Sequence, residues 1–136
     1  MKRDIGLLRE ILLWVDDIPT TPVLMRDCEI NGFSAAEISY HAELMIEGGL
    51  LIGTAERAAS GDEDIRVEGL TMRAHDFLTA VRNPKVWLAA KEAIDACGGV
   101  PFDVALEVAK GFRRKSASRL TDASRGLKGS VTSKGS

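Results

Sequence analysis

Residues 31–52 read NGFSAAEISYHAELMIEGGLLI, and this stretch decides the fold. It opens with an Asn-Gly turn signal, after which Ser34 and Glu37 stand in the S-x-x-E spacing of a capping box. In such a box each side chain accepts a hydrogen bond from a backbone N–H that the first helical turn leaves free. Gly48-Gly49 supply the backbone conformation in which helices end. The sequence therefore predicts a helix from residue 35 to about residue 47.

The neighbouring segments predict a helix before this one and a hairpin after it. Residues 3–17 carry apolar side chains at three- and four-residue steps, the pattern of a helix packed on a core: Ile5, Leu8, Ile11, Leu12 and Val15. Two prolines then exclude helix, and residues 23–30 are expected to form a short strand. Residues 50–55 and 65–67 are expected to pair as a hairpin across the polar stretch 57–64.

The C-terminal part of the chain predicts three more helices. The first begins behind Thr71 as its cap. Asn83-Pro84 cap and start the second, Gly98-Gly99 end it, and Pro101 opens the last. Beyond about residue 116 the chain consists largely of Ser, Gly, Lys and Arg, which bury too little apolar surface to hold a fixed structure. We therefore expect disorder there.

This order of elements predicts an α+β chain that is mostly helical and contains a winged helix-turn-helix-like domain. The capped helix takes the place of the recognition helix, and the β-hairpin takes that of the wing. We expect the winged-helix-like domain over residues 1–83, two additional C-terminal helices packed on it over residues 84–115, and a basic disordered tail over residues 116–136. Residues 19–32 read as turn and strand, which leaves little room for the usual second helix of the motif.

The formal net charge of −2 conceals an uneven distribution of charge. Residues 1–109 carry ten Lys/Arg and nineteen Asp/Glu, a net charge of −9. Residues 110–136 carry eight Lys/Arg and one acidic residue, a net charge of +7. An acidic body therefore precedes a basic tail.

Size and composition predict one ordinary cytoplasmic domain. The chain has 136 residues, of which 45% are hydrophobic, enough for a core of its own. No apolar run approaches the roughly 20 residues of a membrane span, and the first residues lack the pattern of a signal peptide. Cys28 and Cys97 have no redox or metal spacing, so we expect reduced, buried thiols.

Several motifs along the chain resemble those of one known family. They are Met1–Asp4, Leu8–Leu13, Glu29–Phe33, Ile38–His41, Glu47–Ile52, Gly69–Thr71, His75–Leu78, Ala80–Asn83, Val86-Trp87 and Gly98–Val100. In this order they resemble domain-of-unknown-function family 2513 of bacteria and prophages, over residues 1–112. Met72 and Ala74 depart from the family pattern, which has an aromatic residue and a glycine at these positions. The resemblance implies a winged-helix-like fold and no agreed activity.

The two histidines do not predict catalysis. Histidine can act as an acid or a base near neutrality, but no Ser or Cys nucleophile stands in a recognisable motif. We interpret His41 as a packed histidine hydrogen-bonded to the backbone, and His75 in the same way. The His and Cys residues lack metal-ligand spacing, and no glycine-rich phosphate loop occurs. We therefore expect a protein that is not an enzyme and needs no cofactor or metal.

The predicted recognition helix is poorly suited to DNA. DNA-reading helices normally offer Arg, Lys, Asn or Gln to base edges and have basic neighbours for the phosphates. This helix has no Lys or Arg and offers Ser39, Tyr40 and Glu43 on its outer face, and the wing adds Asp62, Glu63 and Asp64. These acids would oppose docking on phosphates in the usual orientation.

Two modes of binding are therefore compatible with the sequence. In the first, a nucleic acid is bound through basic residues near the termini: Lys2, Arg3, Arg9, Arg113, Arg114, Lys115 and Arg119. In the second, the acidic helix and wing bind a protein partner, as an adaptor or inhibitor would. The same charges are also compatible with a merely solvated surface, and the basic tail with contact to the acidic body of the same or another copy. A homodimer through the C-terminal helices is a further hypothesis, and no membrane partner is expected.

Overall fold

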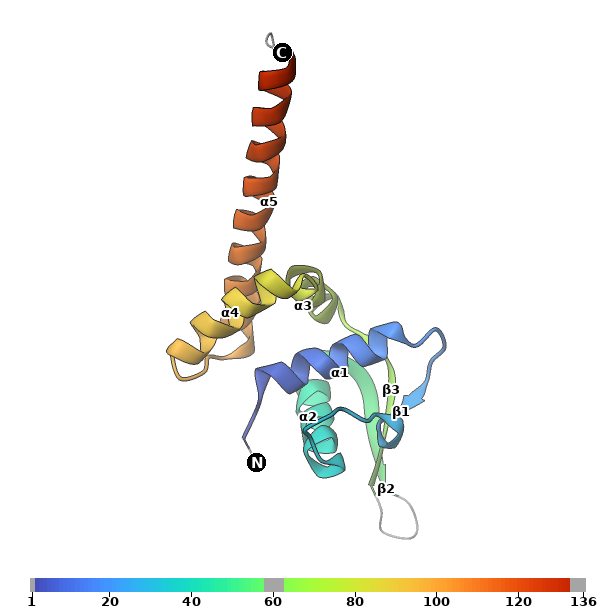
Figure 1. Cartoon of the computed structure of the whole chain (residues 1–136). Helices are drawn as coiled ribbons and strands as arrows, with labels where there is room; N and C mark the ends of the chain where they lie inside the picture. Colours follow the sequence, from blue (N-terminus) through green and yellow to red (C-terminus); the bar gives the residue numbers. More distant parts are fainter. Residues whose placement is uncertain (1, 58–62, 133–136) are drawn as a thin grey trace. The chain divides into compact units, whose positions relative to one another are not determined.

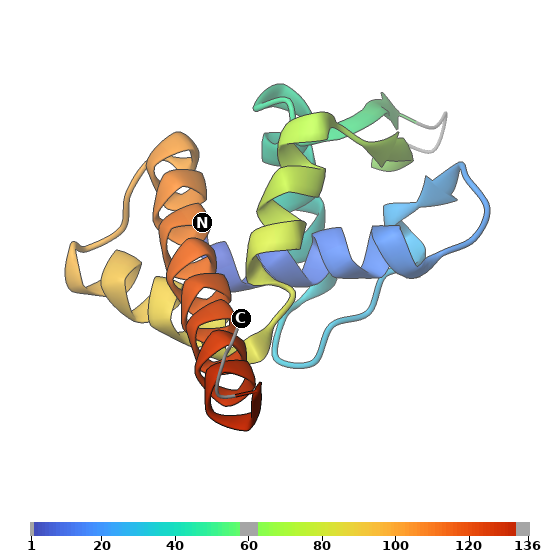
Figure 2. The same ribbon diagram turned by 90° about the horizontal axis from the view of Figure 1, so that it is seen from above.

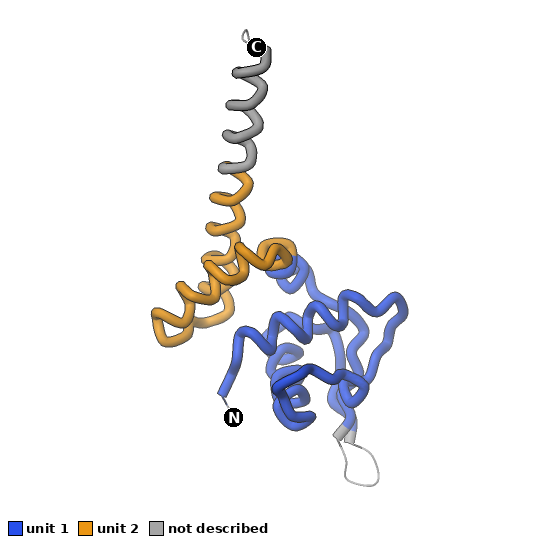
Figure 3. Tube along the Cα trace, in the orientation of Figure 1, with its two compact units in different colours: residues 1–78 blue, residues 79–136 orange. Residues whose placement is uncertain are grey.

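The computed structural model describes the backbone of residues 2–57 and 63–132, and the side chains of residues 2–56 and 64–118. The chain forms two compact units, Met1–Leu78 and Thr79–Ser136, which we call unit 1 and unit 2 (Figure 3). As predicted, it belongs to the α+β class and is mostly helical. The boundary between the units lies inside a helix, whereas the sequence predicts a limit after residue 83.

Unit 1 holds the first two helices and a small sheet (Figure 1). Its elements are α1 (Ile5–Asp17), β1 (Val23–Leu24), the 3₁₀-helix η1 (Met25–Asp27), α2 (Ala35–Glu47), β2 (Leu51–Arg57), β3 (Glu63–Leu70) and most of α3 (Met72–Val81). The three strands are antiparallel in the order β1-β3-β2, so β3 is central. The predicted hairpin is therefore confirmed for its described residues.

The core of unit 1 lies where α1 and α2 meet the sheet. α1 contacts α2 and β3, and α2 contacts β2. Four of the five side chains in the stripe predicted for α1 are buried, Leu8, Ile11, Leu12 and Val15, and so is Leu7. The fifth, Ile5, is half-buried. Burying one such side chain contributes roughly 1.5–3 kcal/mol, so this stripe is a main source of stability.

Both ends of α2 have the predicted geometry. The Glu37 N–H donates to Ser34 Oγ at 3.1 Å, and the Ser34 N–H donates to Glu37 Oε1 at 3.0 Å, which completes the capping box. At the other end Gly49 has a φ of +76°, and the Leu50 N–H donates to the Met45 carbonyl at 2.7 Å. This is a Schellman motif, in which a left-handed residue lets the chain reverse while the last carbonyls stay paired.

The start of α3 is fastened to the end of α2. The Thr71 hydroxyl donates to the Gly49 carbonyl at 2.6 Å, and the Ala74 N–H donates to Thr71 Oγ1 at 3.3 Å. The predicted Thr71 cap is thus confirmed, and it also anchors the turn after α2. Arg73 adds a hydrogen bond from its guanidinium to the Gly48 carbonyl at 2.8 Å.

The strand predicted over residues 23–30 is wrong beyond Leu24. Of residues 23–30, only the two residues of β1 pair with β3, and Val23 lies opposite Val67. The chain then turns into η1, where the Cys28 N–H donates to the Met25 carbonyl at 3.0 Å. This turn places the Met25 side chain in the core, at 2% exposure, which a continued strand would not require. The imperfect alternation of apolar residues reflects this change.

Unit 2 contains the end of α3, α4 (Pro84–Ala96) and α5 (Phe102–Thr132). Asn83 caps α4 as predicted, since its side chain accepts a hydrogen bond from the Lys85 N–H at 2.8 Å. α4 packs against α5, and Figure 2, which looks nearly along α5, shows α4 passing across it. Ala90 of α4 and Ala109 of α5 are fully buried.

The backbone of α5 runs from Phe102 to Thr132, 31 residues in all. Its length is about 46 Å at 1.5 Å per residue. No proline follows Pro101, and Ala, Leu, Arg and Lys are good helix formers, a composition compatible with a long helix. The disordered tail expected over residues 116–136 stays a prediction.

Gly53 marks an irregularity in the hairpin. Ile52 lies opposite Gly69 and Gly53 lies opposite Val67, so Glu68 is an extra residue on β3 and forms a β-bulge. A Cβ added at Gly53 would come well inside van der Waals contact with the Arg66 carbonyl oxygen. The close approach of the two strands at the bulge therefore requires glycine.

We expect Gly53→Ala to destabilise unit 1 by about 1–3 kcal/mol, because the backbone of β3 must shift to admit the methyl group. Gly69→Ala is the matched control, since nothing lies within 4 Å of a Cβ placed there. It should change stability by less than about 1 kcal/mol. Urea unfolding followed by circular dichroism measures both. Equal effects of the two variants would contradict this account of the bulge.

Candidate functional site

His41 is the polar residue of the described core, at 2% exposure. Its Nδ1 lies 2.8 Å from the Glu37 carbonyl oxygen, and its Nε2 accepts a hydrogen bond from the Asp4 N–H at 2.8 Å. Because a backbone N–H can only donate, Nε2 carries no proton and Nδ1 donates to the carbonyl. The predicted packed histidine is confirmed. With both ring nitrogens engaged by the backbone, His41 has no nitrogen left for general acid or base chemistry.

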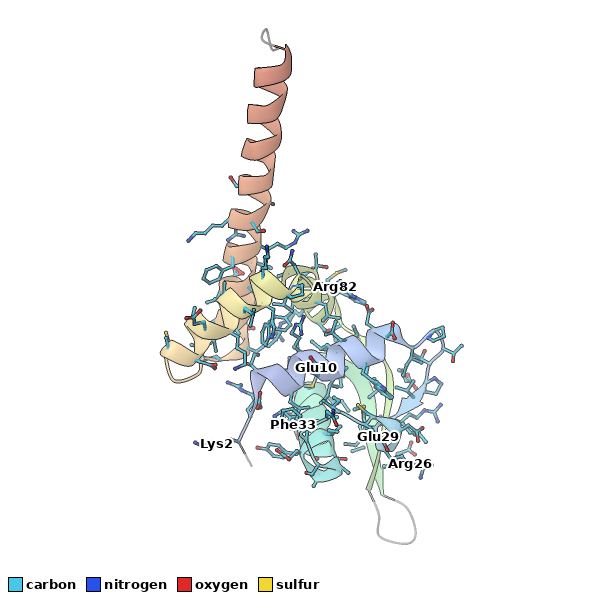
Figure 4. The ribbon with its side chains drawn as sticks, in the orientation of Figure 1. Lys2, Glu10, Arg26, Glu29, Phe33 and Arg82 are labelled. Carbon is cyan, nitrogen blue, oxygen red and sulfur yellow. The ribbon has the colours of Figure 1, made fainter. Side chains whose placement is uncertain are left out.

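Asp4, the partner of His41, is also the N-cap of α1. Its Oδ1 accepts hydrogen bonds from the Gly6 N–H at 2.8 Å and from the Leu7 N–H at 3.2 Å. Lys2 and Arg3, two predicted nucleic-acid contacts, directly precede this residue and are exposed. Figure 4 shows Lys2 directed outward at the beginning of the chain. The structure thus places both cations beside an anchored residue.

The residues predicted on the outer face of α2 lie together within one turn. Ser39, Tyr40 and Glu43 are half-buried, and the Tyr40 ring meets the His41 ring edge-on with centroids 5.6 Å apart. Exposed Glu47 follows on the same helix, which contains no Lys or Arg. This face is therefore acidic with one aromatic side chain.

The three acidic residues predicted on the wing, residues 62–64, are described only in part. Asp62 lies outside the described residues, and Glu63 begins β3 but its side chain lies outside them. Asp64 forms an ion pair with Arg26, its Oδ2 lying 3.6 Å from the guanidinium. This pairing of residues 38 positions apart could not be read from sequence spacing, and it engages Asp64 within unit 1.

The predicted contact Arg9 is less accessible than the other cations. Its side chain is only 12% exposed, and its guanidinium lies 3.4 Å from Glu10 Oε1. Arg9 is therefore ion-paired and largely buried, whereas Lys2 and Arg3 are exposed.

A basic segment lies on α5 in unit 2. Arg113, Arg114 and Lys115 are all exposed, and the Lys115 ammonium lies 5.6 Å from the centre of the Phe112 ring. This distance is within the range of a cation–π contact. Arg119 continues the same helix, but its side chain lies outside the described residues. We call residues 113–115 the basic triplet.

The division of charge follows the two units. Unit 1 contains seven Lys/Arg and fifteen Asp/Glu, a net charge of −8. Unit 2 contains eleven Lys/Arg and five Asp/Glu, a net charge of +6. The two units therefore carry net charges of opposite sign.

The remaining candidates for chemistry lie apart from one another. His75 is exposed on α3, so its predicted packing is wrong. Cys28 is buried as predicted, but Cys97 is exposed because it is the residue at which α4 ends. Burial raises the pKa of the Cys28 thiol from 9.0 to about 11. Within the described part of the chain no three His, Cys, Asp or Glu residues cluster as a metal site.

Comparison with known proteins places the chain in a family. A family model described as "Hypothetical protein (DUF2513)" matches residues 2–101. The chain belongs to this family. It is also 29% identical over 94 residues to an uncharacterized protein of Haemophilus influenzae, a match that covers 69% of this chain and 79% of the relative. No solved structure matches the chain. None of the described helices of this DUF2513 member is long and apolar enough to cross a membrane.

We expect the two cysteines to differ in reactivity. A thiol reagent near pH 8 should modify Cys97 in the folded protein and spare Cys28, because only a thiolate reacts and burial of Cys28 disfavours it. Mass spectrometry of peptides after timed labelling measures this. Equal labelling of the two thiols in the folded protein would contradict the burial of Cys28.

The raised pKa of Cys28 also sets a pH dependence. The folded state holds the Cys28 proton more tightly than the unfolded chain does. The thiol's contribution to the free energy of unfolding is therefore fully present below pH 9 and is lost as the pH rises toward about 11. The free energy of unfolding, measured with urea, should therefore fall less over this pH range for Cys28→Ala than for the wild type. Cys97→Ala, the control, should follow the wild type.

Proposed function

We propose that this DUF2513 protein is a non-enzymatic, nucleic-acid-binding regulator in which unit 1 is a winged-helix domain and α5 contacts phosphates. The observation that carries the proposal is the exposed basic triplet on a helix that has one acidic residue from position 110 onward. Phosphate contacts by Lys and Arg supply most of the affinity of sequence-independent binding. A run of exposed cations along a helix is the electrostatic pattern that such binding requires.

The order of elements in unit 1 supports a winged-helix domain. α1, β1, α2 and the β2–β3 hairpin follow one another as in a winged helix, and the sheet order β1-β3-β2 brings the first strand against the second strand of the hairpin. α2 then corresponds to the recognition helix. η1 stands where the second helix of a winged helix would be expected. That helix is therefore reduced to a single 3₁₀ turn here.

The charge of unit 1 argues against docking through α2 alone. Glu37, Glu43 and Glu47 all lie on this helix, and each would face the repulsion of phosphates in the usual orientation. The predicted contacts that are exposed are Lys2 and Arg3 in unit 1 and the basic triplet in unit 2. We propose these two groups as the phosphate contacts.

Removing the basic triplet by Arg113→Ala, Arg114→Ala and Lys115→Ala should weaken binding to a mixed-sequence DNA duplex. We expect the plot of log affinity against log salt to flatten by about one unit for each phosphate that the variant no longer neutralises. Fluorescence anisotropy at several salt concentrations measures this. Arg82→Ala, Lys85→Ala and Lys91→Ala form the matched control, since they remove the same charge from unit 2 outside α5. An unchanged slope in the triplet variant, or the same weakening in the control, would contradict the proposal.

A second candidate function is a protein-interaction module, an adaptor or inhibitor. It is favoured by the half-buried Tyr40 between Ser39 and Glu43 on the acidic face of α2, because tyrosine with surrounding polar groups is typical of interface centres. Its partner would be a basic protein. The hypothesis of a homodimer through α4 and α5 is separate, and sedimentation velocity of the full chain measures it.

Charge reversal tests the second candidate. Glu43→Lys with Asp62→Lys should remove partners that co-purify with the tagged protein, whereas Asp64 is left in place to preserve its ion pair with Arg26. Asp17→Lys with Asp76→Lys is the control, because both residues are exposed in unit 1 and lie on helices other than α2. Partners are quantified by mass spectrometry. Retention of every partner by the first variant would count against a protein-binding face on α2.

A further inference from the structure

We infer that His41 positions a cationic N-terminal arm, residues 2–4, so that Lys2 and Arg3 form a phosphate-binding surface beside α2. This inference rests on the proposed function. In this inference His41, on α2, holds the segment that carries Lys2 and Arg3, whereas α2 itself has no Lys or Arg. His41 is thus a positioning residue, because it contacts the arm and is itself buried.

The anchor of the arm is specific. The Asp4 N–H donates to His41 Nε2 at 2.8 Å, while the Asp4 carbonyl accepts from the Leu8 N–H at 3.0 Å and its carboxylate accepts from Gly6 and Leu7. The donor, the carbonyl and the side chain of Asp4 are therefore all engaged. Arg3 and Lys2 are one and two residues away from this fixed point, so their positions depend on it.

The bond to Asp4 requires one tautomer of His41. The ring donates through Nδ1 to the Glu37 carbonyl one turn earlier on α2, which leaves the lone pair of Nε2 directed at Asp4. Tyr40 meets the ring edge-on and fills the adjacent space. α2 thus presents an acceptor for the arm from within its buried face.

The gain for binding is preorganisation. A flexible arm must lose conformational entropy when it contacts phosphates, at roughly 1–2 kcal/mol per residue, whereas an arm held by His41 has already lost part of it. The arm offers two exposed cations, and Tyr40 lies against the His41 ring that anchors it. Cations contact phosphates, and aromatic side chains stack on bases.

Two isosteric substitutions separate the two bonds of His41. In His41→Gln the amide oxygen reaches the position of Nε2 and can accept from Asp4. In His41→Asn the amide nitrogen takes the position of Nδ1 and can donate to Glu37, but no acceptor reaches Asp4. The two variants therefore differ in whether the arm is anchored. His75→Asn is the control for the same chemical change at an exposed site.

The experiment combines hydrogen exchange with DNA binding in the full chain. In the wild type, nitrogen NMR should show His41 protonated at Nδ1, and the Asp4 amide should be protected from exchange. His41→Asn should remove this protection and weaken binding to a mixed-sequence duplex by about threefold to tenfold. His41→Gln should keep the protection and bind within about twofold of the wild type. Lys2→Ala with Arg3→Ala should keep the protection and weaken binding.

The ways in which the inference can fail are distinguishable. An Asp4 amide that exchanges equally fast in His41→Asn and in the wild type would overturn the positioning role. Unchanged DNA affinity in Lys2→Ala with Arg3→Ala, or in His41→Asn, would overturn the arm as a phosphate contact, even if the basic triplet variant still binds more weakly. Absence of DNA binding by the wild type would instead remove the proposed function, while the exchange experiment would still decide whether His41 anchors the arm.

Discussion

Two hydrogen bonds at one buried imidazole join the beginning of this chain to the middle of α2. A polar ring in a core is costly unless its nitrogens are paired, and His41 meets this requirement with two backbone groups, the Glu37 carbonyl and the Asp4 N–H. Because Asp4 is also the cap of α1, the same site determines where that helix begins. This ring thus ties the beginning of α1 to α2, beside the apolar side chains that pack between the two helices.

α2 is the element around which unit 1 is built. Its first turn is held by the capping box of Ser34 and Glu37, and its last turn leads through Gly49 into the hairpin. Thr71, beyond the hairpin, returns to bond the Gly49 carbonyl. The hairpin is therefore closed at its base by contacts to the helix before it.

The distribution of charge explains why a winged-helix-like order of elements does not by itself imply DNA reading. The fold supplies a helix and a hairpin, but function depends on the groups that they present. In unit 1 these groups are mainly acidic, and several cations are engaged internally, as Arg26 is with Asp64 and Arg9 with Glu10. Lys2 and Arg3 and the basic triplet of α5 are exposed, and the proposed function places the contacts there.

Local features of this molecule were readable from the amino-acid order, because each depends on residues three or four positions apart. The capping box at Ser34, the cap at Asn83, the helix ends at Gly48-Gly49 and the stripe of α1 were all predicted and are present. The uneven charge and the family were likewise visible. His41 was predicted as a packed histidine, but its partner was not.

The remaining features came from contacts between distant residues. The bond of His41 to Asp4 spans 37 positions, and the ion pair of Arg26 with Asp64 spans 38, so no spacing rule reveals either. Strand β1 stops at Leu24 because the core accepts Met25 only if the chain turns there. Amino-acid order thus determined where α2 begins and ends and where α4 begins, through local hydrogen bonds and apolar periodicity. Tertiary packing determined which distant groups meet, because only the folded chain brings them within bonding distance.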